Sequence, residues 1–412
     1  MTKTARFLEE VNRWGANNYK PLNVVLERGL GAWVWDVDGK KYLDCLSAYS
    51  AVNQGHCNPT IAAAAKTQLD RITLTSRAFH NDQMGPFLHQ ICELAGFPKA
   101  LPMNTGAEGV ETAMKCVRKW GYKVKGIPEG KAEIIGFEGN FHGRTISVIS
   151  WSSEAQYKDG FGPLTPGFKL VPFGDAAAFE KAIAPNTCAI IVEPIQGEGG
   201  VIVPPQGYLT KIRELCTKHN VLMVADEVQT GLGRTGKLFA CNWENVKPDA
   251  MILGKALAGG MYPVSVFLAT EAVMGVFKPG DHGSTFGGNP LGAAIGRAAL
   301  NVLVEEKLAD RANELGEWFM DELRKIGSPH IKDVRGKGLL IGVEMKKESG
   351  PARPYCEALA ERGILCKETH DQVVRFAPPL TVEKKDLEWA LTQIREVLAM
   401  DFGKKPALAG AH

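Results

Sequence analysis

The sequence predicts an α/β protein built on a mostly parallel sheet that helices cover on both faces. From about residue 60 onward, short apolar runs alternate with stretches of helical periodicity, which is typical of repeated strand–helix units. Several runs stop at glycine or a carboxylate, as buried strands do when they reach their C-terminal loops. The expected strands cover residues 132–137, 145–150, 188–193, 221–226, 250–254 and 264–269.

The pattern changes on either side of this region. Near the N-terminus, residues 4–14 predict a short amphipathic helix, and Asp38-Gly39 predicts a hairpin turn after short strands at 24–27 and 33–36. We therefore expect an N-terminal segment (1–50), a large domain (51–288) and a smaller α+β domain (289–412). The smaller domain is expected to contain helices at 291–326 and 382–399, strands at 331–335, 338–345, 363–367 and 373–376, and a frayed tail over 403–412.

Composition excludes several classes of protein. The 412 residues include 48 basic and 46 acidic side chains, a net charge of +2, so no nucleic acid or other polyanion is expected as a partner. No apolar run reaches the about 18 residues that a membrane span needs, and the N-terminus lacks a signal-peptide core. Nine scattered cysteines without a Cys-x-x-Cys pair favour free thiols over disulfides or a zinc site. The sequence predicts a soluble, cytoplasmic enzyme without a metal.

One glycine-rich motif is rejected as a nucleotide site. Gly231-x-Gly233-x-x-Gly236-Lys237 satisfies the dinucleotide pattern and nearly satisfies the P-loop pattern. Both kinds of site require a helix directly afterwards, but the residues from Leu238 onward are a poor helix start. We therefore expect a loop there.

The functional interpretation starts from Lys255, which follows the apolar run 250–253 and Gly254. Ligands of open α/β sheets collect at the carboxyl ends of the strands. A lysine at that edge is partly desolvated, which lowers its pKa and makes it a usable amine nucleophile. An ordinary solvated loop lysine is the alternative, and the decision depends on its neighbours.

Asp226 is one such neighbour, because it ends the run 221–226 far enough before Lys255 for one crossover and a return strand. An aspartate at a strand end is most often a helix cap or a loop residue. Paired with a strand-end lysine, it fits another chemistry. A carboxylate facing a pyridine nitrogen keeps the ring protonated as an electron sink, while the lysine carries the imine.

A phosphorylated ring cofactor also needs an anion seat and an aromatic clamp. Thr105-Gly106-Ala107 opens the helix expected at 106–122, where backbone N–H groups and the helix dipole would bind a phosphate. Phe141 offers an aromatic face, although core packing is its commoner role, and Arg144 offers a fixed cation. Further phosphate contacts are expected from the hydroxyls of Ser284 and Thr285.

Together these motifs resemble the class III (ω-amino acid) aminotransferases, pyridoxal-phosphate enzymes of fold type I. They follow the family's order over nearly the whole chain: Asn104–Gly106, Phe141–Thr145, Glu193–Glu198, Asp226–Gln229, Lys255 and Gly283–Pro290. The resemblance implies a seven-stranded, mostly parallel sheet and pyridoxal 5′-phosphate as the cofactor. It also implies a homodimer, or a larger assembly, whose active sites are shared across the subunit interface.

The resemblance further implies a role for each matching residue. Lys255 would bond to the cofactor and then carry a proton between the substrate carbon and the cofactor. Asp226 would pair with the ring nitrogen, and Gln229 would contact the ring's phenolic oxygen. The other cofactor contacts would come from Thr105, Gly106, Ala107, Phe141 and His142, and from Ser284 and Thr285 of the neighbouring subunit.

Substrate choice depends on fewer residues. Tyr19 and Tyr49 resemble a pair found in the ornithine-specific branch of the family. Arg144 with Tyr19 would bind the α-carboxylate of ornithine, and Tyr49 would help to exclude the α-amine. The second substrate, 2-oxoglutarate, has two carboxylates, so Arg375 would supply a second cation that Glu198 neutralises while ornithine is bound.

The expected reaction transfers the δ-amino group of L-ornithine to 2-oxoglutarate. It would give glutamate 5-semialdehyde and glutamate through a ping-pong cycle that passes through pyridoxamine phosphate. Acetylornithine and 4-aminobutyrate aminotransferases are the alternatives that share the cofactor residues, since the two tyrosines also suit simple packing at a domain junction. A binding protein that has lost catalysis is the alternative from another class.

Overall fold

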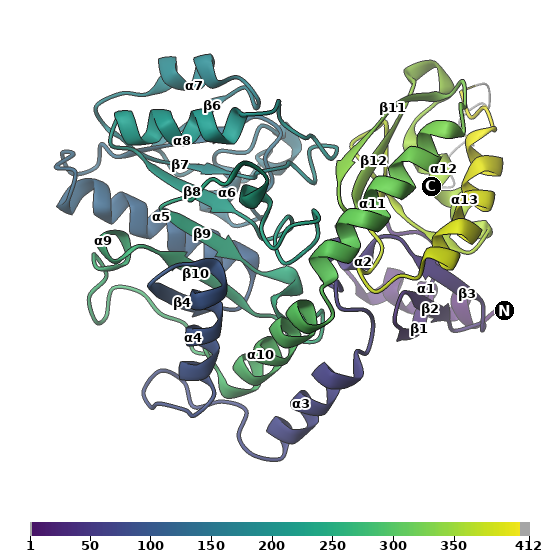
Figure 1. The fold of residues 1–412 in the computed structure, drawn as a ribbon, viewed down its shortest axis with the longest axis horizontal. Helices are drawn as coiled ribbons and strands as arrows, with labels where there is room; N and C mark the ends of the chain where they lie inside the picture. Colours follow the sequence, from purple (N-terminus) through teal and green to yellow (C-terminus); the bar gives the residue numbers. More distant parts are fainter. Residues whose placement is uncertain (1, 404–412) are drawn as a thin grey trace.

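The structure is a computed structural model that describes residues 2–403, so the tail expected to fray lies outside the described residues from 404 onward. A seven-stranded sheet in the order β4-β10-β9-β8-β7-β5-β6 forms its centre (Figure 1). Only β10 runs antiparallel to its neighbours, which confirms the mostly parallel sheet. The strands are β4 (Lys99–Met103), β5 (Glu133–Phe137), β6 (Phe168–Val171), β7 (Thr187–Val192), β8 (Leu222–Asp226), β9 (Ala250–Leu253) and β10 (Ser265–Ala269).

Helices cover both faces of this sheet because its central strands are buried throughout. Helix α5 (Gly106–Lys123) packs one face with Val110, Val117 and Trp120 in a core shared with β7 and β9. On the other face, α7 (Ala176–Ala182) and α8 (Tyr208–Lys218) pack against a second core. The remaining elements around the sheet are α3 (Pro59–Leu69), α4 (Met84–Ala95), α6 (Ile146–Ile149), α9 (Glu271–Met274), η1 (Ala155–Tyr157), η2 (Ala240–Glu244) and η3 (Lys255–Ala258).

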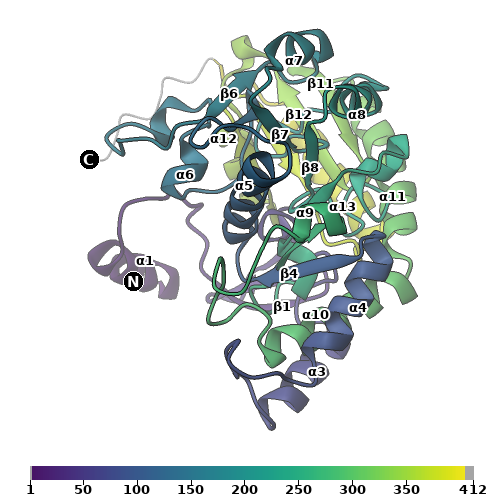
Figure 2. The same ribbon diagram turned by 90° about the vertical axis from the view of Figure 1, so that its left-hand side faces the viewer.

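The N-terminal segment forms a small sheet of its own. Strands β1 (Leu26–Leu30), β2 (Trp33–Asp36) and β3 (Lys41–Asp44) are antiparallel, and β13 (Ile364–Leu365) from the C-terminal part joins β3 in parallel. Helix α1 (Lys3–Trp14) stands away from the rest (Figure 2) and has no buried residue. Its first turn is fixed because the backbone N–H groups of Lys3 and Thr4 donate to the Asp38 carboxylate.

Most of the C-terminal part is an α+β layer beside the large sheet, whereas its first helix, α10, packs against α3, α4 and η3 (Figure 1). Its antiparallel sheet has the order β11-β12-β15-β14. The elements are α10 (Pro290–Glu305), α11 (Leu308–Lys325), β11 (Ile331–Lys337), β12 (Leu340–Met345), η4 (Lys347–Ser349), α12 (Ala352–Glu361), β14 (Lys367–Thr369), β15 (Val373–Phe376) and α13 (Lys384–Leu398). The domain boundaries expected after residues 50 and 288 stay predictions.

Two details of the expected secondary structure are wrong. Residues 145–150 form the short helix α6 rather than a strand, and Ile149 N donates to the Thr145 carbonyl. Their β-branched side chains favour a strand, but β6 occupies the position beside β5, so the segment has no strand to pair with. The range 363–367 divides between two sheets, with β13 beside β3 and β14 beside β15.

Candidate active site

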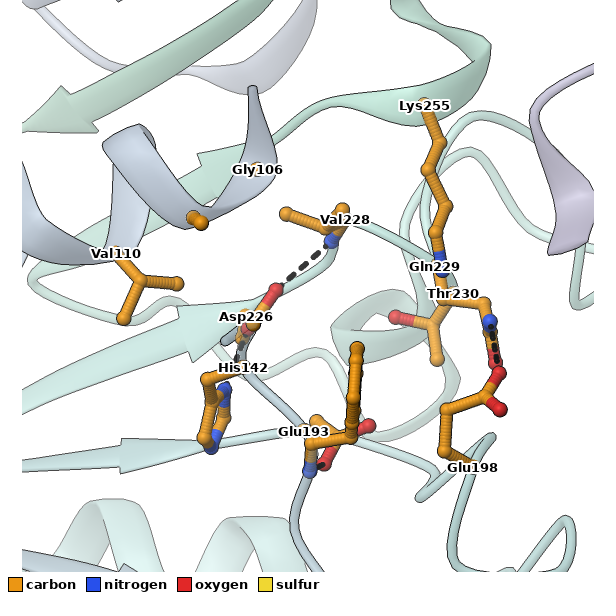
Figure 3. A pocket seen from close by; sticks show the side chains of 13 residues that line it. Gly106, Val110, His142, Glu193, Glu198, Asp226, Val228, Gln229, Thr230 and Lys255 are labelled. Atoms are coloured by element: carbon orange, nitrogen blue, oxygen red, sulfur yellow. Dashed lines mark hydrogen bonds and ion pairs between the residues drawn. The ribbon is translucent and has the colours of Figure 1, made fainter. Parts of the chain in front are cut away.

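The carboxyl ends of β7, β8 and β9 meet the N-terminus of α5 around a cavity of about 180 Å³ (Figure 3). This is the sheet edge at which open α/β folds bind ligands. The side chains come from five separate stretches of sequence, so the fold assembles the site. The lining residues are Gly106, Ala107, Val110, Phe141, His142, Gly143, Glu193, Glu198, Asp226, Val228, Gln229, Thr230 and Lys255.

Lys255 follows β9 and extends its side chain into this cavity (Figure 3). Its φ of 45° lies in the left-handed region, which is costly for a residue with a Cβ and is found mainly at functional sites. Burial lowers the pKa of the Lys255 amine, against the opposing effect of the Glu198 carboxylate. Arg375 lowers the pKa further. A lysine whose protonated form is destabilised in this way is a usable nucleophile and base.

Asp226 is held in one orientation at the end of β8. One carboxylate oxygen accepts from the Val228 N–H at 3.0 Å, and the other lies 2.6 Å from His142 Nδ1. Burial lowers the pKa of His142, but the hydrogen bond to Asp226 and the charges of Asp226 and Glu193 together outweigh burial, and the net pKa is raised. The His142 ring also stacks on Trp151, with ring centroids 4.5 Å apart. Asp226 is thereby a fixed negative group on the cavity wall.

Glu193 is a second buried carboxylate on the wall, at the end of β7. Burial raises its pKa to about 7, although the nearby His142 lowers it. Its oxygen accepts the backbone N–H of Phe141 at 2.9 Å, so it fixes the loop that carries the aromatic face. The sequence interpretation gave Glu193 no role of its own, although its position at a strand end is the signal that singled out Asp226.

The start of α5 has the character of an anion site. Thr105 and Glu108 form a capping box, in which the Thr105 hydroxyl accepts the Glu108 N–H and the Glu108 carboxylate accepts the Thr105 N–H. The N–H groups of Gly106 and Ala107 have no acceptor among residues 2–403, and both residues line the cavity. Two free N–H groups at the positive end of a long helix bind a phosphate well.

The residues present fit pyridoxal phosphate. The Gln229 side-chain oxygen is buried on the cavity wall without a hydrogen-bond partner within the described chain, so a polar group of a ligand can meet it. There is no room for a side chain at Gly106, where a Cβ would lie 2.9 Å from Val228 Cγ1. A free amine, a fixed carboxylate and two free N–H groups face one cavity, matching an aldehyde, a ring nitrogen and a phosphate.

A second and wider cavity of about 810 Å³ adjoins the first, and Lys255, Phe141 and Glu198 line both. It lies between the N-terminal segment, the loops after β5 and strand β14. The expected substrate residues Tyr19, Tyr49 and Arg144 all line it. Within residues 2–403, Arg144 has no carboxylate partner and no hydrogen bond, so its charge faces the cavity free.

Glu198 and Arg375 make the contact that the sequence interpretation expected. Arg375 Nη1 donates to Glu198 Oε1 at 2.5 Å, and Gln229 Nε2 donates to the same oxygen at 3.0 Å. Although burial raises the pKa of Glu198, the charges of Arg375 and Lys255 lower it to about 2. The buried Nε and Nη2 atoms of Arg375 lack partners among the described residues, which leaves donors for a second carboxylate.

Tyr49 is presented by a strained turn. Residues Ser47–Ser50, drawn as α2, all have positive φ, between 48° and 69°, in the left-handed region. Two buried hydrogen bonds hold this turn in place: the Asp44 carboxylate accepts the Ser47 N–H, and the Ser47 hydroxyl donates to the Ala377 carbonyl. The Arg375 guanidinium lies 5.2 Å from the centre of the Tyr49 ring.

Two expected cofactor residues lie away from this chain's cavity. Ser284 accepts from Asn104 Nδ2 at 3.0 Å, and Thr285 is exposed; neither lines the cavity around Lys255. Thr105 lies beside the cavity rather than in it, lining a third opening with Lys255 and Tyr262. Val228 and Tyr157 were not anticipated as parts of the two cavities.

The loop at 231–236, the cysteines and the helices were also subjects of expectations from the sequence. The glycine-rich motif at 231–236 is a buried loop that no helix follows directly, so it does not form a nucleotide site. All nine cysteines are free. None of the helices between residues 2 and 403 combines the length and apolar character that crossing a bilayer requires, and this part of the chain holds no cluster of metal-binding side chains.

Comparison with known proteins identifies the family of the chain. The family described as Aminotransferase class-III matches residues 14–398. An ornithine aminotransferase of Bacillus subtilis is 57% identical over 398 residues, which cover 97% of this chain and 98% of the relative. A Toxoplasma gondii ornithine aminotransferase structure, described with partial occupancy of PLP at its active site, has a TM-score of 0.95 and 46% identity, covering 96% of this chain and 94% of that one. An acetylornithine aminotransferase structure from Elizabethkingia anophelis has a TM-score of 0.88 and 48% identity, covering 97% and 99%.

Proposed function

The chain belongs to the class-III aminotransferases, and from this membership we infer that it is a pyridoxal-phosphate-dependent ornithine aminotransferase. The observation that carries the inference is the position of Lys255, which lines both the cavity suited to the cofactor and the cavity that holds Tyr19, Tyr49 and Arg144. The enzyme transfers the δ-amino group of L-ornithine to 2-oxoglutarate in two half-reactions. The products are glutamate 5-semialdehyde and glutamate.

Pyridoxal phosphate, when bound, supplies an electron sink for the carbon that carries the transferred amine. The free N–H groups of Gly106 and Ala107 would hold its phosphate, and Asp226 would keep its ring nitrogen protonated. Phe141 and Val228 would enclose the ring, and Gln229 would face its phenolic oxygen. These contacts define where the substrate carbon must sit.

Lys255 moves the proton. Its amine has a lowered pKa because the group is buried, so the neutral form that accepts a proton from the substrate carbon is available. The same side chain returns that proton once the electrons have been redistributed.

Substrate orientation is the task of the wider cavity. Arg144 and Tyr19 would bind the α-carboxylate of ornithine at the end far from Lys255, which directs the δ-amine toward the reacting centre. Tyr49 narrows the space beside Lys255 and disfavours entry of the α-amine. While ornithine is bound, Glu198 neutralises Arg375; when 2-oxoglutarate enters, its second carboxylate would take the spare donors of Arg375.

The active enzyme is a homodimer or a larger assembly of such dimers. Thr285 is exposed and lies away from its own chain's cavity, which suits a contact with the neighbouring subunit's phosphate. The opening lined by Thr105, Lys255 and Tyr262 is the side of the site on which a second subunit would lie. The free cysteines favour a cytoplasmic location.

A second candidate is N-acetylornithine as the preferred amine donor, because a structural relative of that activity is 48% identical to the chain. A catalytically inert binding protein is the candidate from another class. Reduction of the protein with borohydride in the presence of pyridoxal phosphate tests the assignment to the enzyme class. We expect label on the peptide that contains Lys255, and aldehyde product from ornithine and 2-oxoglutarate. A colourless protein without label would support the inert binding protein.

A further inference from the structure

Tyr157 lines the wider cavity beside Arg144, and none of the roles proposed above for the cofactor residues or for the Glu198–Arg375 pair includes it. The Arg144 guanidinium carbon lies 3.7 Å from the centre of the Tyr157 ring and 5.5 Å from that of Phe141. The two rings meet edge to face, with centroids 6.2 Å apart and planes at 81°. The guanidinium therefore sits in the corner that two perpendicular aromatic rings form.

Among the described residues, the Arg144 side chain interacts with these two rings and makes no hydrogen bond or ion pair. The neighbouring backbone is fixed, because the Thr145 hydroxyl donates to Glu111 on α5 at 2.5 Å. The guanidinium itself has no carboxylate partner and no hydrogen bond within residues 2–403. Without the rings, a long exposed arginine would sample many rotamers and would lose that freedom on binding a substrate.

A stacked guanidinium keeps its hydrogen-bonding capacity. The N–H groups of arginine lie in the guanidinium plane, and contact with a ring face uses none of them. A carboxylate in the cavity can then take two parallel N–H bonds from a fork whose plane is already fixed. An ion pair with a protein carboxylate would fix the arginine equally well, but it would occupy the donors that the substrate needs.

Tyr157 is itself held firmly enough to serve as a support. It ends η1 (Ala155–Tyr157), where its N–H donates to the Glu154 carbonyl at 3.2 Å. The residue before this turn is also held, because the Glu154 N–H donates to the Ser152 hydroxyl at 3.1 Å. The Tyr157 hydroxyl makes no hydrogen bond with the described residues. The contact with Arg144 is made by the face of the ring.

We propose that Tyr157 is a positioning residue that fixes the plane of Arg144 and so sets the affinity for substrates with a carboxylate far from the transferred amine. This inference rests on the proposed function, because it takes Arg144 as the residue that binds the α-carboxylate of ornithine. Tyr157 acts through Arg144 and needs no contact with the substrate. Its effect belongs in KM rather than in kcat, since Lys255 performs the chemistry.

A double-mutant cycle on the holoenzyme tests the proposal. The variants are Tyr157→Leu, Tyr157→Phe, Arg144→Met and the double variant Arg144→Met/Tyr157→Leu, with kcat and KM measured for ornithine. We expect Tyr157→Leu to raise KM about fivefold to tenfold with kcat changed less than about twofold, the range of a cation–π contact. Tyr157→Phe retains the ring face and should keep the KM for ornithine near the wild-type value. In the Arg144→Met background, Tyr157→Leu should add nothing further.

Three outcomes would overturn the proposal. A Tyr157→Phe enzyme as impaired as Tyr157→Leu would show that the hydroxyl contacts the substrate. Equal effects of Tyr157→Leu with and without Arg144 would show that the ring acts elsewhere, and a fall in kcat alone would show a role in the chemistry. Trp35→Leu is the matched control, because it removes a similar stack of Arg28 over Trp35, at 4.1 Å, outside the cavity lining.

Failure of the proposed function would look different. If the wild-type holoenzyme formed no aldehyde from ornithine, the assignment of the substrate would fall before any variant was compared. If the wild-type enzyme used ornithine and the cycle showed no coupling between Arg144 and Tyr157, only the role of Tyr157 would fall.

Discussion

The two cavities at Lys255 are built in opposite ways. The cofactor cavity is enclosed by strand ends, and its carboxylates Asp226 and Glu193 are buried and hydrogen-bonded. The wider cavity is walled by loops, by the N-terminal segment and by β14, and its Arg144 is exposed and unpaired within the described chain. On the proposed function, the chemistry common to all substrates would be placed on the rigid sheet, and recognition would be placed on segments that can change without disturbing it.

The junction between the large sheet and the C-terminal part depends on buried polar contacts. Arg234 is fully buried and donates to Asn53 Oδ1 and to the carbonyls of Leu339 and Pro378. One side chain thus connects the loop after β8, the loop that holds Asn53, and the C-terminal part. Burial lowers the pKa of Arg234 to about 9.

The largest expected effect lies in the cofactor cavity. Lys255→Ala should lower kcat by at least about a thousandfold for every amine donor, because a positioned acid–base group is lost. Steady-state rates with ornithine and with 4-aminobutyrate are the measurement. Lys247→Ala, at an exposed loop position, is the control and should retain activity. A loss confined to one donor would contradict a shared chemical centre.

Breaking the junction should destabilise the protein rather than alter its chemistry directly. Arg234→Met leaves three buried acceptors without a donor, so we expect a loss of about 3 kcal/mol in the free energy of unfolding. Urea denaturation of the holoenzyme measures it. The control Arg362→Met removes a half-exposed pair with Glu396 and should cost less than about 1 kcal/mol. Equal losses of unfolding free energy in the two variants would show that the buried contacts of Arg234 do not stabilise the junction.

The Glu198–Arg375 pair should make the difference in stability between the wild type and Glu198→Gln depend on pH. A Glu198 pKa lowered from 4.5 to about 2 corresponds to at most about 3 kcal/mol of stability at neutral pH. Because the folded-state pKa is the lower one, this stability is present above pH 4.5 and is lost as the pH falls toward 2. Unfolding free energies of the wild type and Glu198→Gln, measured between pH 3 and 6, should converge as the pH falls. A constant gap would mean that Arg375 does not stabilise the carboxylate.

The smallest expected effect is a shift in substrate preference. Tyr49→Ile should raise turnover of 4-aminobutyrate relative to ornithine by about tenfold, because it widens the space beside Lys255 without touching the cofactor. Tyr49→Phe keeps the ring and should leave the ratio near that of the wild type. The ratio of kcat/KM values for the two donors is the measurement, and an unchanged ratio in Tyr49→Ile would remove Tyr49 as a selector.

The two cavities also differ in how far the sequence predicted them. Asp226 and Lys255 could be found because an apolar strand that stops at a polar residue marks one edge of the sheet. The seven-stranded sheet followed from the family resemblance and is confirmed. Residues 145–150 were predicted as a strand on local preference alone, but β6 occupies the position beside β5, and the segment forms the helix α6 next to α5.

The contacts of the wider cavity left no local pattern in the sequence. Arg144 precedes α6 and Tyr157 ends η1, and the two side chains meet across the segment between them. Outside the cavities, Arg234 is likewise hydrogen-bonded to three segments distant from it in sequence. Single-sequence periodicity carries no information on such contacts. The left-handed turn at Ser47–Ser50 is equally hidden, because no glycine marks it.

The most direct test of the account is the ratio of kcat/KM values for ornithine, N-acetylornithine and 4-aminobutyrate with 2-oxoglutarate as the acceptor. We predict that ornithine gives the highest value, because Arg144 and Tyr19 receive its α-carboxylate while its δ-amine reaches Lys255. A higher value for N-acetylornithine would contradict the assignment of the wider cavity to ornithine, and would leave the cofactor cavity as described.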